Sequence, residues 1–326
     1  MAELTTYRDA VSDGLARELR RDQSVVLLGE DIGAAGGVFK TTVGLFEEFG
    51  ADRVWDTPIS EQAIMGAAMG AAMTGLRPVA EIMFSDFLAC CWDYLANEIP
   101  KARYMTGGQV TMPLVVRTAN GGGLGFGAQH SQSVENWTFT VPGLKIAAPS
   151  TPADVVGLMA SAIRSDDPVV IFEHKGLFAS KGEAAPPEHV VPLGEARIAR
   201  SGDDVTVVAL ASTVPLALAA ADQLAEDDIS CEVIDLRCLV PLDMATVLGS
   251  LEKTSRLVVV EENPYQGGWG ATVVSIVADE GFELLDAPVR RVAGENVPLP
   301  FADALEKRVI PTAGKLVEAV RRLTSY

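Results

Sequence analysis

The chain has 326 residues, 48% of them hydrophobic, which is enough to build two packed domains. Its 44 Asp and Glu residues outnumber its 26 Lys and Arg residues, and the formal net charge is -18. A surface this acidic argues against nucleic acid and anionic membranes as partners, and it would suit docking onto a basic protein. Residues 1–22 carry charges throughout and lack the apolar core of a secretory leader. We therefore expect a cytoplasmic protein without a membrane anchor.

The cysteine content argues against a zinc site. Cys90, Cys91, Cys231 and Cys238 form no CxxC pair, and none lies at ligand spacing from any of the three histidines. Adjacent cysteines cannot readily bridge each other, so we expect Cys90 and Cys91 to be buried thiols in a reducing compartment.

The N-terminal residues predict a helix followed by a buried strand. Within residues 6–21, apolar side chains recur at helical spacing on one face, namely Tyr7, Ala10, Val11, Leu15 and Leu19. Ser24–Leu28 is a short apolar run of the kind found in buried parallel strands. The glycine-rich loop after it lacks the GxGxxG spacing, which argues against a dinucleotide site.

The stretch Asp56–Pro78 predicts a helix that begins at Ser60. The Ser60 side chain is placed to cap the first turn, where the helix dipole favours the acidic Glu61. Small residues behind them form a face that another backbone could approach closely: Gly66, Ala67, Gly70 and Ala71. Glycine costs about 1 kcal/mol in a helix interior relative to alanine, which indicates a packing requirement. On spacing alone, a buried helix with an acidic first turn explains these residues without a functional role.

Strands and helices then alternate, as is typical of a doubly wound parallel sheet. We expect strands at Arg77–Ile82, Pro113–Arg117, Leu144–Ala148 and Pro168–Glu173, and helices from Phe84 to about Arg103 and at Pro152–Ile163. Pro100 should kink or shorten the first of these helices. Five glycines between Gly121 and Gly127 exclude regular structure there. That loop is either a flexible connection or a place where the backbone approaches a ligand.

Periodicity is lost over residues 174–191, where proline, glycine and charge concentrate, and we interpret this segment as a domain linker. A second alternating unit follows, with expected strands at Asp204–Ala209, Ser230–Leu236, Arg256–Glu261 and Val289–Ala293 and helices near 213–225, 243–253, 268–280 and 312–323. The sequence thus predicts two doubly wound α/β domains, residues 1–190 and 191–326.

Successive blocks of the chain resemble one known family in the order in which they occur. The blocks are GED (Gly29–Asp31), GGVFKTTVGL (Gly36–Leu45), DTPISE (Asp56–Glu61), GLRPVAEIMFSDF (Gly75–Phe87), RYMTGGQ (Arg103–Gln109), GAQHSQS (Gly127–Ser133), PGLK (Pro142–Lys145), CEVIDLR (Cys231–Arg237) and LDAPVRRV (Leu285–Val292). They span nearly the whole chain. They resemble the beta subunit of the thiamine diphosphate-dependent decarboxylase, the first component of 2-oxo acid dehydrogenase complexes.

The resemblance implies an N-terminal pyrimidine-binding domain, a C-terminal transketolase-type domain and a heterotetramer of two alpha and two beta chains. In such a tetramer the alpha chain holds the diphosphate of thiamine diphosphate and magnesium, and the beta chain holds the aminopyrimidine. The sequence fits this division, because the family's GDG signature for the diphosphate is missing. Gly202-Asp203-Asp204 precedes a strand and lacks the second glycine.

The resemblance also assigns residues to the cofactor site. Glu61 would be the carboxyl group that shares a proton with the pyrimidine nitrogen N1′, a task suited to a carboxyl whose pKa is raised by burial. Phe87 matches the aromatic residue that stacks on the pyrimidine ring. Glu30 matches a second acid in the family's passage between the two active sites. Without the resemblance, Phe87 would be an ordinary core residue and Glu30 a polar residue ending a strand.

Further residues are implied outside the pyrimidine site. His130 matches a histidine near the substrate and the incoming lipoyl group, where a titratable donor could assist acyl transfer. A potassium ion held mostly by main-chain carbonyls would map near Leu114, Ala162, Ile163 and Asp167. Asp286 and the C-terminus match the surface that holds the binding domain of the lipoyl-acyltransferase core. As isolated residues, His130 and Asp286 would be interpreted as surface residues.

Two departures from the family pattern bear on the substrate. Tyr94 stands where the family usually has Gln, and Pro100 interrupts a segment that usually continues with Ala. The blocks suit pyruvate and acetoin as substrates, and branched-chain 2-oxo acids less well. Two alternatives stay open: a split transketolase-type carboligase that uses another acceptor than lipoamide, and a scaffold subunit without catalytic residues.

Overall fold

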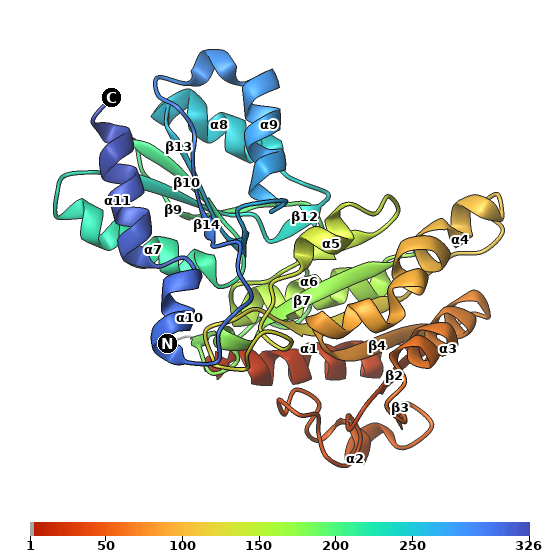
Figure 1. The fold of residues 1–326 in the computed structure, drawn as a ribbon. Coiled ribbons are helices and arrows are strands. Elements are labelled where there is room, and N and C mark those ends of the chain that lie inside the picture. The colour runs from red at the N-terminus through yellow and green to blue at the C-terminus, as the bar shows by residue number, and fades with distance from the viewer. Residues whose placement is uncertain (1–2) are drawn as a thin grey trace. The chain divides into compact units, whose positions relative to one another are not determined.

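The computed structural model describes residues 3–326, which divide into two compact units (Figure 1). The first unit comprises the chain up to Asn120 together with Trp137–Leu193, and the second comprises Gly121–Asn136 and Gly194–Tyr326. The segment Gly121–Asn136 therefore belongs with the second unit, although residues of the first unit flank it in the sequence. The domain limits 1–190 and 191–326 stay a prediction.

The first unit is built on a parallel sheet. Its strands are β2 (Val25–Gly29), β3 (Val54–Asp56), β4 (Arg77–Phe84), β5 (Val115–Asn120), β6 (Lys145–Ala147) and β7 (Val169–His174), in the order β6-β7-β5-β4-β2-β3. Every residue of β2, β5 and β7 is buried, because helices cover both faces of a doubly wound sheet. The predicted parallel α/β architecture of this unit is confirmed.

Two antiparallel strands lie outside this sheet: β1 (Leu4–Thr6) pairs with β8 (Lys181–Glu183). The β8 residues fall within the segment 174–191 that the sequence suggested as a linker. This part of the segment is instead tied to the N-terminus of the first unit, because Ala184 also donates its N–H to the Glu3 carbonyl. Residues 181–183 are therefore a short, largely exposed strand and not part of a linker.

The helices of the chain's first half are α1 (Tyr7–Arg21), α2 (Leu45–Phe49), α3 (Glu61–Met73), α4 (Ile99–Met105), α5 (Glu135–Phe139) and α6 (Pro152–Arg164). The helix predicted over 6–21 is α1, and its apolar face is buried as expected: Tyr7, Ala10, Val11, Leu15 and Leu19 are at most 1% exposed. This face packs on α6, and the Thr6 side chain caps α1 by accepting the N–H of Asp9 (3.1 Å).

The single helix expected from Phe84 to Arg103 is wrong. The segment consists of a 3-10 helix (Ser85–Cys91), a π-helix (Tyr94–Glu98) and α4. Pro100 lies in the first turn of α4, where its missing N–H is tolerated. The Ala96 carbonyl, which a helical N–H at position 100 would have reached, accepts the Lys101 ammonium instead.

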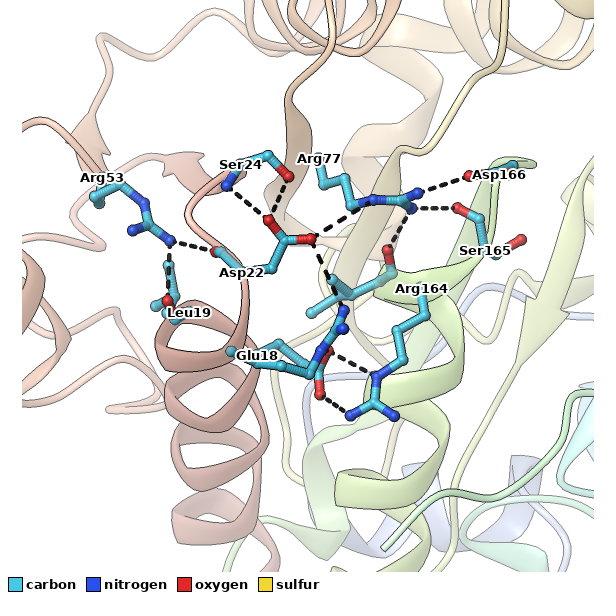
Figure 2. A network of polar contacts seen from close by, with 11 residues as sticks. Glu18, Leu19, Asp22, Ser24, Arg53, Arg77, Arg164, Ser165 and Asp166 are labelled. Atoms are coloured by element: carbon cyan, nitrogen blue, oxygen red, sulfur yellow. Dashed lines mark hydrogen bonds and ion pairs between the residues drawn. The ribbon is translucent and has the colours of Figure 1, made fainter. Parts of the chain in front are cut away.

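Arginine side chains tie the elements of the first unit together beyond the end of α1 (Figure 2). Arg53 donates to the backbone carbonyls of Leu19, Asp22 and Val25. Arg77, at the start of β4, donates to the carbonyls of Ile163 and Ser165 (both 3.0 Å) and to the Asp166 carboxylate (2.7 Å). These contacts fix the strand β4 to the end of α6.

The second unit also contains a doubly wound sheet. The strands of this sheet are β9 (Arg197–Arg200), β10 (Val205–Ala209), β11 (Cys231–Asp235), β13 (Leu257–Pro264) and β14 (Arg290–Gly294). The short strand β12 (Cys238–Val240) is not part of it. The helices of the unit are α7 (Thr213–Ala225), α8 (Met244–Thr254), α9 (Gly270–Glu280), α10 (Asp303–Val309) and α11 (Ala313–Thr324). The sheet order is β14-β13-β10-β11-β9, with only β9 antiparallel among these strands. Helices α7 and α11 lie on one side of this sheet and α8 and α9 on the other (Figure 1).

Candidate active site

Two acidic residues meet at the start of α3. Glu30 directly follows β2 and is only 6% exposed, and its carboxylate accepts the backbone N–H of Ser60, the residue before Glu61. Burial and then the charge of Glu61 raise the pKa of Glu30. The predicted Ser60 cap is wrong, because its hydroxyl makes no capping hydrogen bond. The N–H of Ser60 instead donates to Glu30, and the effect of the Glu61 charge on the pKa of Glu30 shows that the two acids lie near each other.

The 3-10 helix Ser85–Cys91 lies beside these acids. It contacts α3, and the charge of Glu61, after burial, contributes to raising the pKa of the Cys90 thiol and that of Cys91 to about 12. Phe87 on this helix is half-buried and meets Phe84 edge-on, with ring centroids 5.4 Å apart. Cys90 is exposed, contrary to expectation, because it points away from the core that buries Cys91. Glu61, Glu30 and the element that carries Phe87 thus form one region of the first unit.

The small face of α3 is used in two ways. A Cβ atom added to Gly66 would lie 2.6 Å from the Tyr94 hydroxyl, so the glycine makes room for that ring. Ala67 and Gly70 are exposed, and a Cβ on Gly70 would meet nothing within 4 Å. Close packing within the unit therefore concerns Gly66, and the contact comes from Tyr94, the residue at which the sequence departs from the family pattern.

A buried ion network in the sheet was missed at the sequence level. Arg117 on β5 donates to both oxygens of Glu173 on β7 (2.7 and 2.8 Å) and to Glu81 on β4 (2.8 Å). Burial raises the pKa of Glu81, although Arg117 opposes the shift, and the charge of Glu81 in turn adds to the raised pKa of Glu30. The sequence signal for this network was the presence of Glu81, Arg117 and Glu173 within otherwise apolar strands.

The glycine loop Gly121–Gly127 is an anion-binding nest whose anions are side chains of the same chain. Its alternate glycines have positive φ, at Gly121, Gly123, Gly125 and Gly127. The N–H of Gly122 donates to Glu262 (2.7 Å), and the N–H groups of Gly123 and Gly125 donate to the two oxygens of Glu306 (2.9 and 3.0 Å). These contacts argue against a flexible connection, and the approach of the backbone to a ligand stays a prediction.

His130 follows this loop and belongs to the second unit. The side chain of His130 is half-buried, and the backbone N–H of His130 donates to the Gly127 carbonyl (3.5 Å). The residues after it are anchored too: Ser133 donates to Glu262 (2.6 Å), and Asn263 donates to the Ser133 carbonyl (2.7 Å). The other candidate residues, Glu30, Glu61 and Phe87, belong to the first unit.

The carbonyls of the expected potassium site already accept hydrogen bonds. Leu114 accepts from Val169 (3.0 Å), Ala162 from Ser165 (3.2 Å) and Ile163 from the Arg77 guanidinium (3.0 Å). The Asp167 carboxylate binds Arg103 (2.6 Å) and Lys145 (3.1 Å); burial opposes the effect, but these two cations lower its pKa. A potassium ion would compete here with the protein's own cations, so these residues do not fit it.

The part of the chain that the structure describes shows no divalent-metal site of its own. Over residues 3–326, no group of three or more His, Cys, Asp and Glu side chains is arranged to hold a metal ion. A membrane-spanning helix is likewise not found in that part of the chain.

Asp286 is exposed, after a 3-10 helix (Phe282–Leu284). The C-terminal Tyr326 is 68% exposed, and its hydroxyl accepts from Arg290 (3.0 Å).

Two family descriptions match the chain, one for each half. Residues 3–181 match the transketolase pyrimidine-binding domain, and residues 194–316 match the transketolase C-terminal domain. A solved structure of a split-gene transketolase, described as an inactive beta4 tetramer, superposes with a TM-score of 0.81 and 25% identity over 98% of both chains. The fold therefore defines a two-domain protein of the transketolase type.

Named relatives narrow this class. The chain is 44% identical to the beta subunit of acetoin:2,6-dichlorophenolindophenol oxidoreductase of Bacillus subtilis, over 99% of this chain and 98% of that one. It is also 44% identical to the pyruvate dehydrogenase E1 component subunit beta of Rickettsia felis (98% of both), and 42% identical to the 2-oxoisovalerate dehydrogenase subunit beta of Bacillus subtilis (98% and 99%). The chain belongs to the family of beta subunits of thiamine diphosphate-dependent 2-oxo acid and acetoin dehydrogenases.

Proposed function

We propose that the chain pairs with an alpha subunit to form a dehydrogenase component that cleaves pyruvate or acetoin and passes the two-carbon unit to a lipoyl-acyltransferase. The observation that carries the proposal is the pair of neighbouring acids Glu30 and Glu61 at the start of α3, in a chain of this family. The carboligase alternative is not favoured, since identity to the dehydrogenase subunits (42–44%) exceeds that to the split-gene transketolase (25%).

The first unit fits the pyrimidine end of thiamine diphosphate. When bound, this cofactor stabilises the negative charge left on carbon by cleavage of a carbon–carbon bond. Glu61 would hold a proton at N1′ of the pyrimidine, and Phe87 would offer its ring for stacking. Glu30, whose pKa is raised, keeps a proton more readily than an exposed glutamate and is suited to exchange it with Glu61.

The diphosphate end requires a partner chain. The glycine loop is a nest of the kind that suits a phosphate, but three of its N–H groups already bind Glu262 and Glu306. We infer that the alpha chain holds the diphosphate with magnesium, and that two alpha and two beta chains assemble. The exposed small residues of α3, Ala67 and Gly70, would allow a neighbouring backbone to approach closely.

Two further roles belong to this proposal. His130 would act as the proton donor during acyl transfer to the lipoyl group. Asp286, which is exposed, and the C-terminus would contact a basic binding domain of the acyltransferase core, in keeping with the net charge of -18. We place the protein in the cytoplasm, because its four cysteines are thiols that form no disulfide with one another.

The proposal is tested with the assembled protein. The chain is co-expressed with an alpha-type subunit, and turnover is measured with pyruvate, acetoin and branched 2-oxo acids, using a redox dye or lipoylated protein as acceptor. Glu61→Gln should lower turnover at least about 100-fold, the usual contribution of a group that transfers a proton. Glu47→Gln, an equal change of charge on the exposed side of α2, is the control.

Three results would count against the proposal. Unchanged turnover of Glu61→Gln would favour the scaffold subunit. Turnover with an aldehyde or ketone acceptor, and none with lipoylated protein, would favour the carboligase. A purified chain that binds and uses the cofactor without an alpha subunit would refute the shared site.

A further inference from the structure

We propose that Glu262 and Glu306 are positioning residues for acyl transfer, because they hold the glycine loop that precedes His130. This inference rests on the proposed function for the role of His130. The contacts themselves all lie within the second unit and do not depend on that role.

The two carboxylates bind the loop through its backbone. Glu306, on α10, uses both oxygens, one for the N–H of Gly123 and one for that of Gly125. Glu262, on β13, accepts the N–H of Gly122 and the hydroxyl of Ser133, so it holds the chain on both sides of His130. Residues 183 and 140 positions apart in the sequence are thereby joined at one loop.

The chemistry of Glu306 is that of a buried anion compensated by N–H dipoles. Its side chain is 1% exposed, and it forms no ion pair among the residues that the structure describes. The positive φ of Gly123 and Gly125 turns their N–H groups toward it. A Cβ on Gly122 would lie 3.4 Å from Glu306 Oε1, and one on Gly125 would lie 3.3 Å from the Phe301 carbonyl, so both positions pack closely against these oxygens. The contact therefore determines where the loop, and His130 after it, can lie.

Removing the acceptor should release the loop without removing any group that reacts. Glu306→Ala leaves the N–H groups of Gly123 and Gly125 without partners, whereas Glu306→Gln keeps one acceptor oxygen and nearly the same shape. Loop mobility should therefore be lowest in the wild type, higher in Glu306→Gln and highest in Glu306→Ala. Glu262→Gln can keep the oxygen that accepts both Gly122 and Ser133, because the other oxygen faces Ser212, so its effect on the loop should be no larger than that of Glu306→Gln. Glu283→Gln, an exposed change of the same charge in the second unit, is the matched control.

The experiment measures two properties of the assembled dehydrogenase. Hydrogen–deuterium exchange of peptides covering residues 121–136 reports the loop directly, and a thermal melt confirms that each variant folds. Steady-state assays compare kcat and KM with lipoylated protein and with a redox dye, which bypasses acyl transfer. For Glu306→Ala we expect hydrogen exchange in the loop to become at least tenfold faster and kcat for acyl transfer to fall at least tenfold. Turnover with the dye should stay within twofold of wild type.

A double-mutant cycle with His130→Asn separates positioning from general damage. If Glu306 acts through His130, adding Glu306→Ala to His130→Asn should lower acyl transfer less than twofold further. Unchanged exchange, fully additive losses or equal losses with both acceptors would overturn the inference while the proposed function stands. A wild-type assembly inactive with every acceptor would refute the proposed function and the positioning role, and the exchange data would then report the contacts alone.

Discussion

Replacing Arg117 with methionine should destabilise the first unit by about 3–5 kcal/mol, the usual cost of removing one partner from a buried ion pair. The Arg117 side chain is 3% exposed, and it is the donor to Glu173 (2.7 and 2.8 Å) and to Glu81 (2.8 Å). Methionine fills a similar volume but leaves two buried carboxylates facing each other. At about 2–4 °C per kcal/mol for a unit of this size, Tm should fall by about 6–20 °C.

Urea denaturation of the purified chain at pH 8 measures this loss. The triple variant Arg117→Met, Glu81→Gln, Glu173→Gln should recover most of it, because removing a whole buried ion network is often close to neutral. The deficit of the single variant should also shrink as the pH is lowered. Burial raises the pKa of Glu81 even in the presence of Arg117, so bare carboxyls take up protons more easily.

Two outcomes would refute this reasoning. A loss below about 1 kcal/mol would mean that the buried network contributes no more than an exposed pair. A triple variant as unstable as the single one would mean that packing around Arg117, rather than its charge, stabilises the sheet.

Three further predictions concern other residues of the first unit. Gly66→Ala should destabilise the protein by about 1–3 kcal/mol, because the added methyl overpacks against Tyr94. In a Tyr94→Gln background the same change should stabilise it by up to about 1 kcal/mol. Equal effects in the two backgrounds, measured by urea denaturation, would contradict the contact between Gly66 and Tyr94. The pKa of Glu30 is higher in the native protein than in the unfolded chain. Stability therefore falls as the pH rises from the unfolded pKa through the native pKa, where native Glu30 loses its proton. Glu30→Gln should therefore gain on wild type in melts from pH 4 to pH 8, and a constant difference would contradict this. Exchanging potassium for tetramethylammonium salts should leave Tm unchanged, because Arg77 already binds Ile163, whereas Arg77→Met should cost more than about 1 kcal/mol; a potassium-dependent Tm would contradict this.

Periodic apolar residues predicted most of the regular elements. Helix α1 and the buried strands β2 and β7 lie where the sequence predicted them, because burial of one face or of both faces leaves a repeated pattern. The family resemblance, which rests on blocks along the whole chain, is confirmed by the two matched domains and by the named relatives.

The errors arose where distant contacts override local preference. The 3-10 and π segments before Pro100 follow from the missing N–H of proline and from the packing of Tyr94 on Gly66, neither of which alters apolar spacing. The backbone N–H of Ser60 binds Glu30, which is separated from it in the sequence by α2 and β3. Capping rules, which consider only neighbouring residues, therefore predicted the wrong contact for Ser60. No local pattern links the glycine loop to Glu306, because the partner lies 183 residues further along.

The placement of Gly121–Asn136 limits how this polypeptide can be cut or recombined. A gene truncated near residue 190 would encode this insert without Glu262, Asn263 and Glu306, and the complementary fragment would retain those side chains without the amides they bind. Chimeras that exchange the C-terminal half with another subunit should therefore carry the insert along with it. A chimera made with a single crossover between the halves would combine the glycine loop of one protein with the counterparts of Glu262 and Glu306 from another.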